Sequence, residues 1–262
     1  MASEEQPKIK LYWLEQSRAQ NILWLLEELK VPYELETFHR VNMFAPPELK
    51  KIHPLGKSPV VSITPPGSAE PIILAESGFI TQYLSEHFGQ GTTMMPKRWK
   101  DGQEGKAGGE TEQWLRWQYC LHYVEGSLMP MLVMSMVLGM LKGSRIPFFI
   151  RPITAMVANQ LFSRLIFPNA KAHLGFLEQQ LETSGDEYLC GPELTSADVL
   201  LSFGLIAAKD KFESFGTWDS SPRTLYPKVF AYIDRLETHP GYKRSVEKVK
   251  EIDSSFGVQY SA

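Results

Sequence analysis

Hydrophobic positions in the first ninety residues switch repeatedly between the period of a β-strand and that of an α-helix. The apolar run at residues 9–14 predicts a strand. Apolar residues then recur at i, i+3, i+4 and i+7 from Ile22 to Leu29, and Ser17 with Gln20 forms a capping-box pattern, so we expect a helix that begins at Ser17. Similar patterns predict the elements that follow: a strand at 31–39, a short helix at 46–54, a hairpin of 58–63 with 71–75, and a helix at 78–88.

The order of these elements, β, α, β, α, β, β, α, matches a thioredoxin-like topology, which we predict for residues 8–90. Residues 91–109 are rich in glycine and poor in apolar side chains, a composition typical of a linker. Beyond them the strand pattern ends, and apolar residues keep helical spacing over residues 110–255. The sequence therefore predicts an α/β thioredoxin-like N-terminal domain followed by an all-α C-terminal domain.

One helix start in the second domain is marked by three signals. Thr195 is an N-cap residue type, and Asp198 follows three residues later, where its carboxylate can reach back to the cap. Leu194 and Val199 have the spacing of a hydrophobic staple. We therefore expect a helix to begin after Thr195.

Residues 128–141 hold five of the ten methionines and no charge. Fourteen residues fall short of the roughly 20 that a spanning helix needs, so we expect no transmembrane segment. Flexible methionines suit both ordinary core packing and an adaptable apolar binding surface. The sequence leaves these two roles open.

Composition narrows the function classes. In 262 residues, 27 basic and 30 acidic side chains give a net charge of −3, so we expect no nucleic-acid partner and interpret the basic run at 97–100 as a solvated loop. Cys120 and Cys190 are too far apart for a CxxC pair, and two cysteines cannot form a four-cysteine zinc site; we expect no metal. The polar N-terminus shows no signal-peptide pattern, and with the low cysteine content this predicts a cytoplasmic protein.

Five local sequences carry a resemblance to a known family: residues 53–61, 75–80, 195–198, 226–229 and 239–243. The first three resemble the cis-proline loop, the glutamyl-binding turn and the helical-domain capping box of glutathione S-transferases, and the last two together resemble the family's last long helix. The match runs from Ile9 to about Val249. Residues 13–19 and 46–54 are most similar to a fungal branch of the family that includes an endoplasmic-reticulum-associated yeast enzyme.

The resemblance implies glutathione as cosubstrate and no bound cofactor. The γ-glutamyl end of glutathione carries a carboxylate beside an ammonium group. Glu76 and Ser77 stand where a predicted strand ends and a helix begins. Helix N-terminal amides and the Ser77 hydroxyl suit the carboxylate, and Glu76 suits the ammonium. A plain helix-capping role is the alternative for Ser77.

The same resemblance places the other two units of glutathione. Pro59 is cis in the family, and the backbone of the preceding residue, here Ser58, pairs with the cysteinyl unit. That preceding residue is usually β-branched and apolar, but a backbone contact does not require its side chain. Lys57 is expected to pair with the glycyl carboxylate and His53 to add a hydrogen bond; a solvated surface position is the alternative for each.

Catalysis requires a hydrogen-bond donor that favours the glutathione thiolate over the thiol. Tyr12 ends the first strand six residues before Arg18, the spacing of tyrosine-type family members, and Ser17 lies at the expected helix start. Serine-type members place their hydroxyl four residues before this arginine, where this chain has Leu14. Tyr12 and Ser17 therefore remain alternatives, beside a backbone amide or Gln16.

Two functions follow from the resemblance. The first is a transferase that conjugates the thiolate to hydrophobic electrophiles in detoxification, with glutathione-dependent peroxidase activity as a further reaction. The second is a non-catalytic glutathione-binding or regulatory member, which Leu14 motivates. No cysteine lies near the first helix, so thiol transfer through a mixed disulfide is disfavoured.

The resemblance also implies a homodimer. Residues 128–141 fall early in the helical domain, where relatives build the electrophile pocket. Peripheral contact with an endoplasmic-reticulum membrane is a third role for this stretch, as in the yeast relative.

Overall fold

The computed structural model describes residues 6–185 and 187–258. Its first part contains a four-stranded sheet of order β2-β1-β3-β4. β1 runs parallel to β2 and antiparallel to β3, and β3 runs antiparallel to β4. The strands are β1 (Lys8–Leu14), β2 (Tyr33–Phe38), β3 (Val60–Thr64) and β4 (Ile72–Ala75). This mixed sheet confirms the predicted thioredoxin-like domain.

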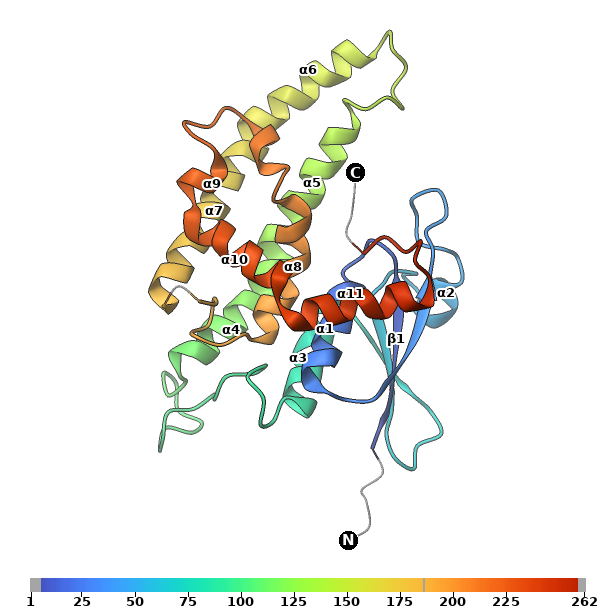
Figure 1. The fold of residues 1–262 in the computed structure, drawn as a ribbon, viewed down its shortest axis with the longest axis vertical. Helices are drawn as coiled ribbons and strands as arrows, with labels where there is room; N and C mark the ends of the chain where they lie inside the picture. The colour runs from blue at the N-terminus through green and yellow to red at the C-terminus, as the bar shows by residue number, and fades with distance from the viewer. Residues whose placement is uncertain (1–5, 186, 259–262) are drawn as a thin grey trace.

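Three helices accompany the sheet: α1 (Ala19–Leu29), α2 (Leu49–Ile52) and α3 (Ser77–Phe88). α1 and α3 lie between the sheet and the helical part of the molecule (Figure 1). α1 packs against β1, α3, α8 and α11, so polar residues on it are buried as well as apolar ones. Buried Asn21 donates its amide to the carbonyl of Leu200 in α8 at 2.7 Å. The two parts of the chain therefore share one continuous core.

The predicted start of the first helix is wrong by two residues. α1 begins at Ala19, and the residue before it, Arg18, makes no capping hydrogen bond with its side chain. The Gln20 side chain does not reach back to Ser17: it accepts from Trp13 Nε1 at 3.1 Å and donates to Ser245 Oγ at 2.8 Å. Buried partners on other elements have replaced the local capping box.

Beyond residue 111 the described chain is essentially helical, which confirms the predicted all-α part. Two π-helical turns, η1 and η2, join α4 to α5 and α6 to α7 without a break. α11 returns to the first part and packs along α1 (Figure 1). The division into residues 8–90, 91–109 and 110–255 stays a prediction. The elements are α4 (Glu112–Tyr123), η1 (Val124–Leu128), α5 (Met129–Met140), α6 (Arg151–Leu161), η2 (Phe162–Ile166), α7 (Phe167–Ser184), α8 (Ser196–Ala208), η3 (Phe212–Phe215), α9 (Pro222–Leu225), α10 (Pro227–Thr238) and α11 (Pro240–Ile252).

The capping box before α8 forms as predicted, with Thr195 at the N-cap and Asp198 at the third helical position. Asp198 is fully buried, and its carboxylate also accepts from the Leu189 amide at 3.0 Å and from the Tyr232 hydroxyl at 2.8 Å. Burial raises the pKa of Asp198. Asp198 therefore binds the loop at Leu189 and helix α10 in addition to capping α8.

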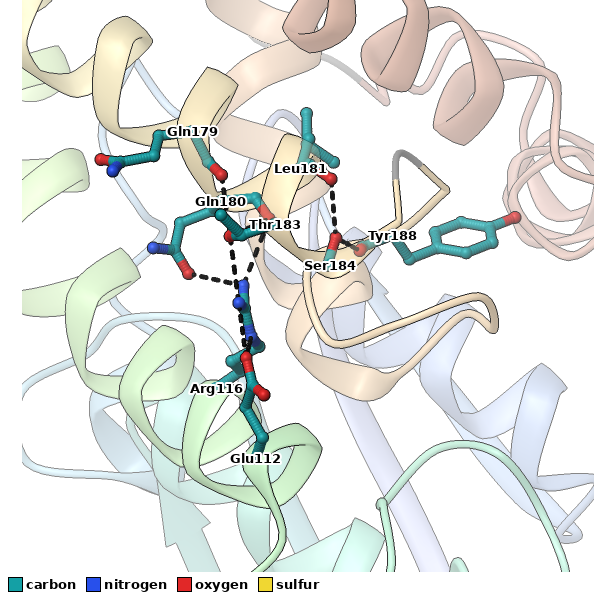
Figure 2. Close-up of polar contacts among 8 residues, drawn as sticks. All are labelled: Glu112, Arg116, Gln179, Gln180, Leu181, Thr183, Ser184 and Tyr188. Carbon is teal, nitrogen blue, oxygen red and sulfur yellow. Dashed lines mark hydrogen bonds and ion pairs between the residues drawn. The ribbon is translucent and has the colours of Figure 1, made fainter.

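The helical part is braced by a polar contact between its long helices. Arg116 of α4 pairs with Glu112 at 2.7 Å and donates to the carbonyl of Gln180 in α7 at 3.2 Å and to Thr183 Oγ1 at 3.0 Å. Figure 2 shows these side chains bridging the two helices. At the end of α7, Ser184 donates to the carbonyl of Tyr188 at 2.5 Å. The packing of α4 against α7 is therefore stabilised by polar as well as apolar contacts.

The helix through the methionine-rich stretch is longer than the sequence indicated. α4, η1 and α5 form one 29-residue helix, Glu112–Met140, which is long and apolar enough to cross a membrane by length and composition. In its most apolar window 44% of the residues are buried inside the protein. The expectation of no spanning helix, drawn from fourteen residues alone, therefore used too short a segment.

Candidate active site

Strand register brings three predicted site segments to one end of the sheet. Tyr12 of β1 is paired with Val60 of β3, and Val60 is paired with Ala75 of β4. The segment Ser58–Pro59 directly precedes Val60, and Glu76–Ser77 directly follows Ala75. Side chains that are up to sixty-five positions apart in the sequence are therefore gathered by the backbone pairing alone.

Glu76 turns the chain from β4 into α3. Its φ of 70° and ψ of 114° lie where a side chain is rarely accommodated, at a cost of about 1–3 kcal/mol. The Ile80 amide already donates to the Glu76 carbonyl at 2.9 Å, so the helix begins at once. Ser77 is the first residue of α3 and is 2% exposed. This strained turn directs the free N-terminal amides of α3 toward the end of the sheet.

A carboxylate from the helical part meets Ser77. The Ser77 hydroxyl donates to Glu125 Oε1 at 2.6 Å, and the other oxygen of Glu125 forms an ion pair with Arg18 Nη1. Glu125 lies in η1, and its side chain is 25% exposed. π-Helical turns are frequent at functional sites because they redirect side chains that a regular helix would aim elsewhere. Sequence reasoning missed Glu125, since no local pattern links it to Ser77 forty-eight residues earlier.

The Ser58–Pro59 peptide bond is cis, as the resemblance implies. Pro59 is buried and Ser58 is half-buried. The Ser58 hydroxyl donates to the Tyr12 carbonyl at 2.9 Å, so its side chain ties β1 to the segment before β3. The Ser58 side chain therefore has a structural partner, which accounts for a polar residue at a position that is usually apolar in the family.

Lys57 and His53 lie on the segment that approaches Ser58 from α2. Lys57 is exposed, and His53 is half-buried with its Nδ1 accepting from the Leu55 amide at 3.4 Å. No hydrogen bond in the described chain joins either side chain to Ser77. Their roles toward the glycyl carboxylate stay predictions.

Comparison with known proteins bears on this geometry. Residues 7–86 match the family profile "Glutathione S-transferase, N-terminal domain", and residues 158–248 match "Glutathione S-transferase, C-terminal domain". Over 252 residues the chain is 34% identical to Glutathione S-transferase 1 of Saccharomyces cerevisiae, covering 95% of this chain and 99% of that protein. The chain belongs to the glutathione S-transferase family. The predicted enzyme class is thereby confirmed.

Two further similarities agree with the assignment. The transferase is 30% identical to Glutathione S-transferase 3 of Schizosaccharomyces pombe, over 93% of this chain and 88% of that one. A glutathione S-transferase from Actinobacillus pleuropneumoniae superposes with a TM-score of 0.65 at 27% identity, covering 95% of this chain and 94% of the other. The two-domain fold expected from the sequence is confirmed by these similarities.

Of the two hydroxyls predicted to activate the thiol, that of Ser17 is already engaged. Ser17 is 7% exposed, donates to the Leu14 carbonyl at 2.7 Å and accepts from the Ala19 amide at 3.2 Å. Tyr12 is half-buried and lies between Leu11 and Trp13, both fully buried, so its ring is on the opposite face of the sheet from theirs. Among residues 6–185 and 187–258 the Tyr12 hydroxyl has no hydrogen-bond partner.

The remaining alternative was a backbone amide or Gln16. The Gln16 amide donates to the Gly257 carbonyl at 2.6 Å, and the Gln16 carbonyl accepts from Arg40 Nη2 at 2.9 Å. The backbone of Gln16 is therefore held by two other segments of the transferase. The Gln16 amide is therefore less accessible to a thiolate than the Tyr12 hydroxyl.

The cysteines of the transferase are structural. Cys120 is 1% exposed and Cys190 is 2% exposed. Contact with Cys120 and burial raise the pKa of the Cys190 thiol, which makes it a poor nucleophile. Within the described residues no group of three or more metal-ligating side chains is found.

Proposed function

We propose that this transferase binds glutathione at the end of the sheet and conjugates its thiolate to hydrophobic electrophiles. The observation that carries the proposal is the polar group of Ser77, Glu125 and Arg18, placed beside the Glu76 turn and the Ser58–Pro59 segment. Glutathione needs complementary charges at its γ-glutamyl end and a backbone edge at its cysteinyl unit. This corner of the fold supplies both.

The γ-glutamyl group would enter at the N-terminus of α3. Its carboxylate suits the Ser77 hydroxyl, the first amides of α3 and the Arg18 guanidinium, all donors. Its ammonium group suits the carboxylates of Glu76 and Glu125. In this arrangement the carboxylate of the ligand replaces Glu125 as the acceptor of the Ser77 hydroxyl.

The reaction that follows is a nucleophilic substitution, in which the glutathione sulfur attacks an electrophilic carbon. The thiol of free glutathione, with a pKa of about 8.5, loses its proton to solvent, and a donor from the protein stabilises the resulting thiolate. With 1-chloro-2,4-dinitrobenzene, the thiolate forms a C–S bond and chloride leaves with the C–Cl electron pair. The same thiolate supports the proposed peroxidase reaction, in which two glutathiones and a hydroperoxide give glutathione disulfide, an alcohol and water.

We propose Tyr12 as the activating donor ahead of Ser17, because the Ser17 hydroxyl already bonds the Leu14 carbonyl. A hydrogen bond to a charged group contributes about 1.5–3 kcal/mol, so Tyr12→Phe should lower kcat about 10- to 100-fold and shift the rise of kcat to higher pH. Ser17→Ala should leave that profile in place. The pH dependence of conjugation measures both; a profile that neither substitution moves rejects both residues.

The electrophile site is proposed beside η1, at the start of α5. Glu125 contacts Ser77, and the methionine-rich helix α5 begins four residues after Glu125. Met131 and Leu132 of α5 are buried in the core, whereas Met134 and Met140 are 44% and 41% exposed. The methionines are therefore divided between core packing and free apolar surface, which suits substrates of varied shape.

A homodimer is proposed from apolar surface on the first domain. Ile72 and Ile73 on the edge strand β4 are 43% and 39% exposed, and Phe79 on α3 is 52% exposed. An exposed edge strand with apolar side chains is a surface that proteins usually cover. Sedimentation velocity that gives twice the 29.8 kDa chain mass supports the dimer, and a monomer mass contradicts it.

Cytoplasmic location with peripheral binding to an endoplasmic-reticulum membrane is proposed from the apolar arm, the hairpin of α5, residues 141–150 and α6. The arm projects away from the rest of the molecule (Figure 1). The arm, residues 129–161, contains no aspartate or glutamate but three basic residues, Lys142, Arg145 and Arg151, so it suits an anionic lipid surface. Its exposed apolar side chains are Val133, Met134, Val137, Met140, Phe148, Phe149, Ile150, Ile153, Met156, Val157 and Leu161.

A further inference from the structure

The last described residues, 253–258, fold back over the loop between β1 and α1. After α11 the chain turns back toward the end of the sheet (Figure 1). Phe256 is 6% exposed, with its ring edge-on to Trp13 at 5.0 Å and stacked on His39 at 4.2 Å between centroids. Val258 is 8% exposed. We call residues 253–258 the C-terminal strap.

The C-terminal strap contacts the loop through its backbone at Gln16. The Gln16 amide donates to the Gly257 carbonyl at 2.6 Å, and Gln16 has a φ of 48°, a conformation that side chains rarely adopt. A Cβ on Gly257 would lie 2.7 Å from Gln16 Nε2 and 2.9 Å from its Cγ. Only glycine fits here without displacing Gln16, so the strap and the loop are in close contact.

Charged side chains also join the C-terminal strap to the β1–α1 loop. His39 Nε2 lies 3.1 Å from Asp253 Oδ2 of the strap, and His39 Nδ1 lies 3.4 Å from Glu15 Oε2 of the loop. Arg40 holds the loop as well: its amide donates to Glu15 Oε1 at 2.7 Å and its guanidinium to the Gln16 carbonyl at 2.9 Å. His39 is therefore the link between two acidic side chains, one on each segment.

We propose that the C-terminal strap is a positioning element that holds the β1–α1 loop, and with it the thiol end of the site, in the reactive arrangement. The loop follows β1, which carries Tyr12, and Phe256 of the strap packs on Trp13, the residue next to Tyr12. The strap touches the loop, and no hydrogen bond, ion pair or ring contact in the described chain joins it to Glu76 or Ser77. Arg18, at the end of the same loop, is held separately by its ion pair with Glu125, so the strap affects the thiol more than the affinity for the γ-glutamyl group. This inference rests on the glutathione binding proposed above.

The contact between the strap and the loop depends on pH through the charge of His39. Hydrogen bonding to Asp253 comes first among the causes that raise the pKa of His39, with Glu15 adding to it. Hydrogen bonds from Ser255 and His39 lower the pKa of Asp253 to about 2. The pair is charged on both sides from about pH 4 upward, and its attraction is lost as pH rises through the raised pKa of His39. The strap is therefore held at pH values below the raised pKa of His39 and loosened above it.

Three substitutions test the positioning role. Phe256→Ala and Gly257→Ala should each lower kcat about tenfold and raise the pKa of the bound glutathione thiol, while KM for glutathione changes less than about twofold. Ile252→Ala, at a 51% exposed residue just outside the strap, is the matched control and should change none of these. Unchanged kcat and thiol pKa in both strap variants overturn the inference. Wild-type protein that does not bind glutathione contradicts the proposed function instead.

A second measurement does not depend on activity. Hydrogen exchange at the Gln16 amide, compared between the wild type and His39→Gln from pH 5 to 9, reports how firmly the strap is held. The wild type should show more protection than the variant at low pH, and the difference should vanish as His39 deprotonates. Equal protection at every pH overturns the pH dependence.

Discussion

At the scale of single residues, Glu125 decides how the two parts of the transferase meet at the site. Its two carboxylate oxygens are divided between Ser77 of α3 and Arg18 before α1. Because the polar group of the proposed site comes from both domains, it forms only when the two domains are packed together. The arrangement also leaves Arg18 neutralised until a ligand carboxylate arrives.

Glu125→Gln should therefore weaken glutathione binding. The substitution removes the negative charge that pairs with Arg18 and suits the ligand ammonium, at a cost of about 1.5–3 kcal/mol, so KM for glutathione should rise about 10- to 100-fold. Ser127→Ala, an exposed position on the same π-helical turn, is the matched control. Steady-state kinetics with varied glutathione measures both, and equal KM values for the two variants would reject a binding role for Glu125.

At the scale of elements, the polar side chains that cap helices contribute unequally to stability. Asp198 is buried and accepts from groups on three segments, whereas Thr111 at the N-cap of α4 accepts one bond from the Trp114 amide at 3.2 Å. Losing an exposed cap costs about 1 kcal/mol, and each buried donor left unsatisfied costs about 1–3 kcal/mol more.

Asp198→Ala should accordingly lower the free energy of unfolding by at least about 3 kcal/mol, and Thr111→Ala by about 1 kcal/mol. Urea unfolding followed by circular dichroism gives both values. If the two variants lose the same stability, the added contacts of Asp198 with Leu189 and Tyr232 contribute nothing.

The elements that form as predicted are those whose signals are local in the sequence. The strands, the hairpin and the α8 cap depend on local spacing, and all of them form. The Ser17 cap fails because Gln20 finds Trp13 and Ser245 as buried partners, and no local pattern announces a contact with residue 245. Glu125 escaped prediction for the same reason. Elements set by local sequence signals could be predicted, whereas contacts between the two domains could not.

At the scale of the whole molecule, the apolar arm leaves many apolar side chains uncovered. Phe148 and Phe149 between α5 and α6 are 81% and 68% exposed. So much apolar surface on one projection marks an interaction site. The basic residues on the arm favour an anionic lipid surface over a second copy of the same arm, whose like charges would face each other.

Co-sedimentation with vesicles tests the arm. The wild type should pellet with phosphatidylcholine vesicles that contain phosphatidylserine, and binding should fall at high salt. Replacing both Phe148 and Phe149 by Ser should abolish binding, and Ile252→Ser outside the arm should retain it. No binding by the wild type would contradict a membrane role.

In the proposed function, the corner formed by Ser77, Glu125 and the Ser58–Pro59 segment binds glutathione, and Tyr12 beside it stabilises the thiolate. The most direct measurement is the ultraviolet absorbance of the thiolate as glutathione bound to the wild type is titrated with pH. The pKa of the bound thiol should fall below the value of about 8.5 of the free thiol, and Ser77→Ala should require about tenfold more glutathione to reach saturation. Glutathione that binds with an unchanged thiol pKa, or not at all, would contradict the account.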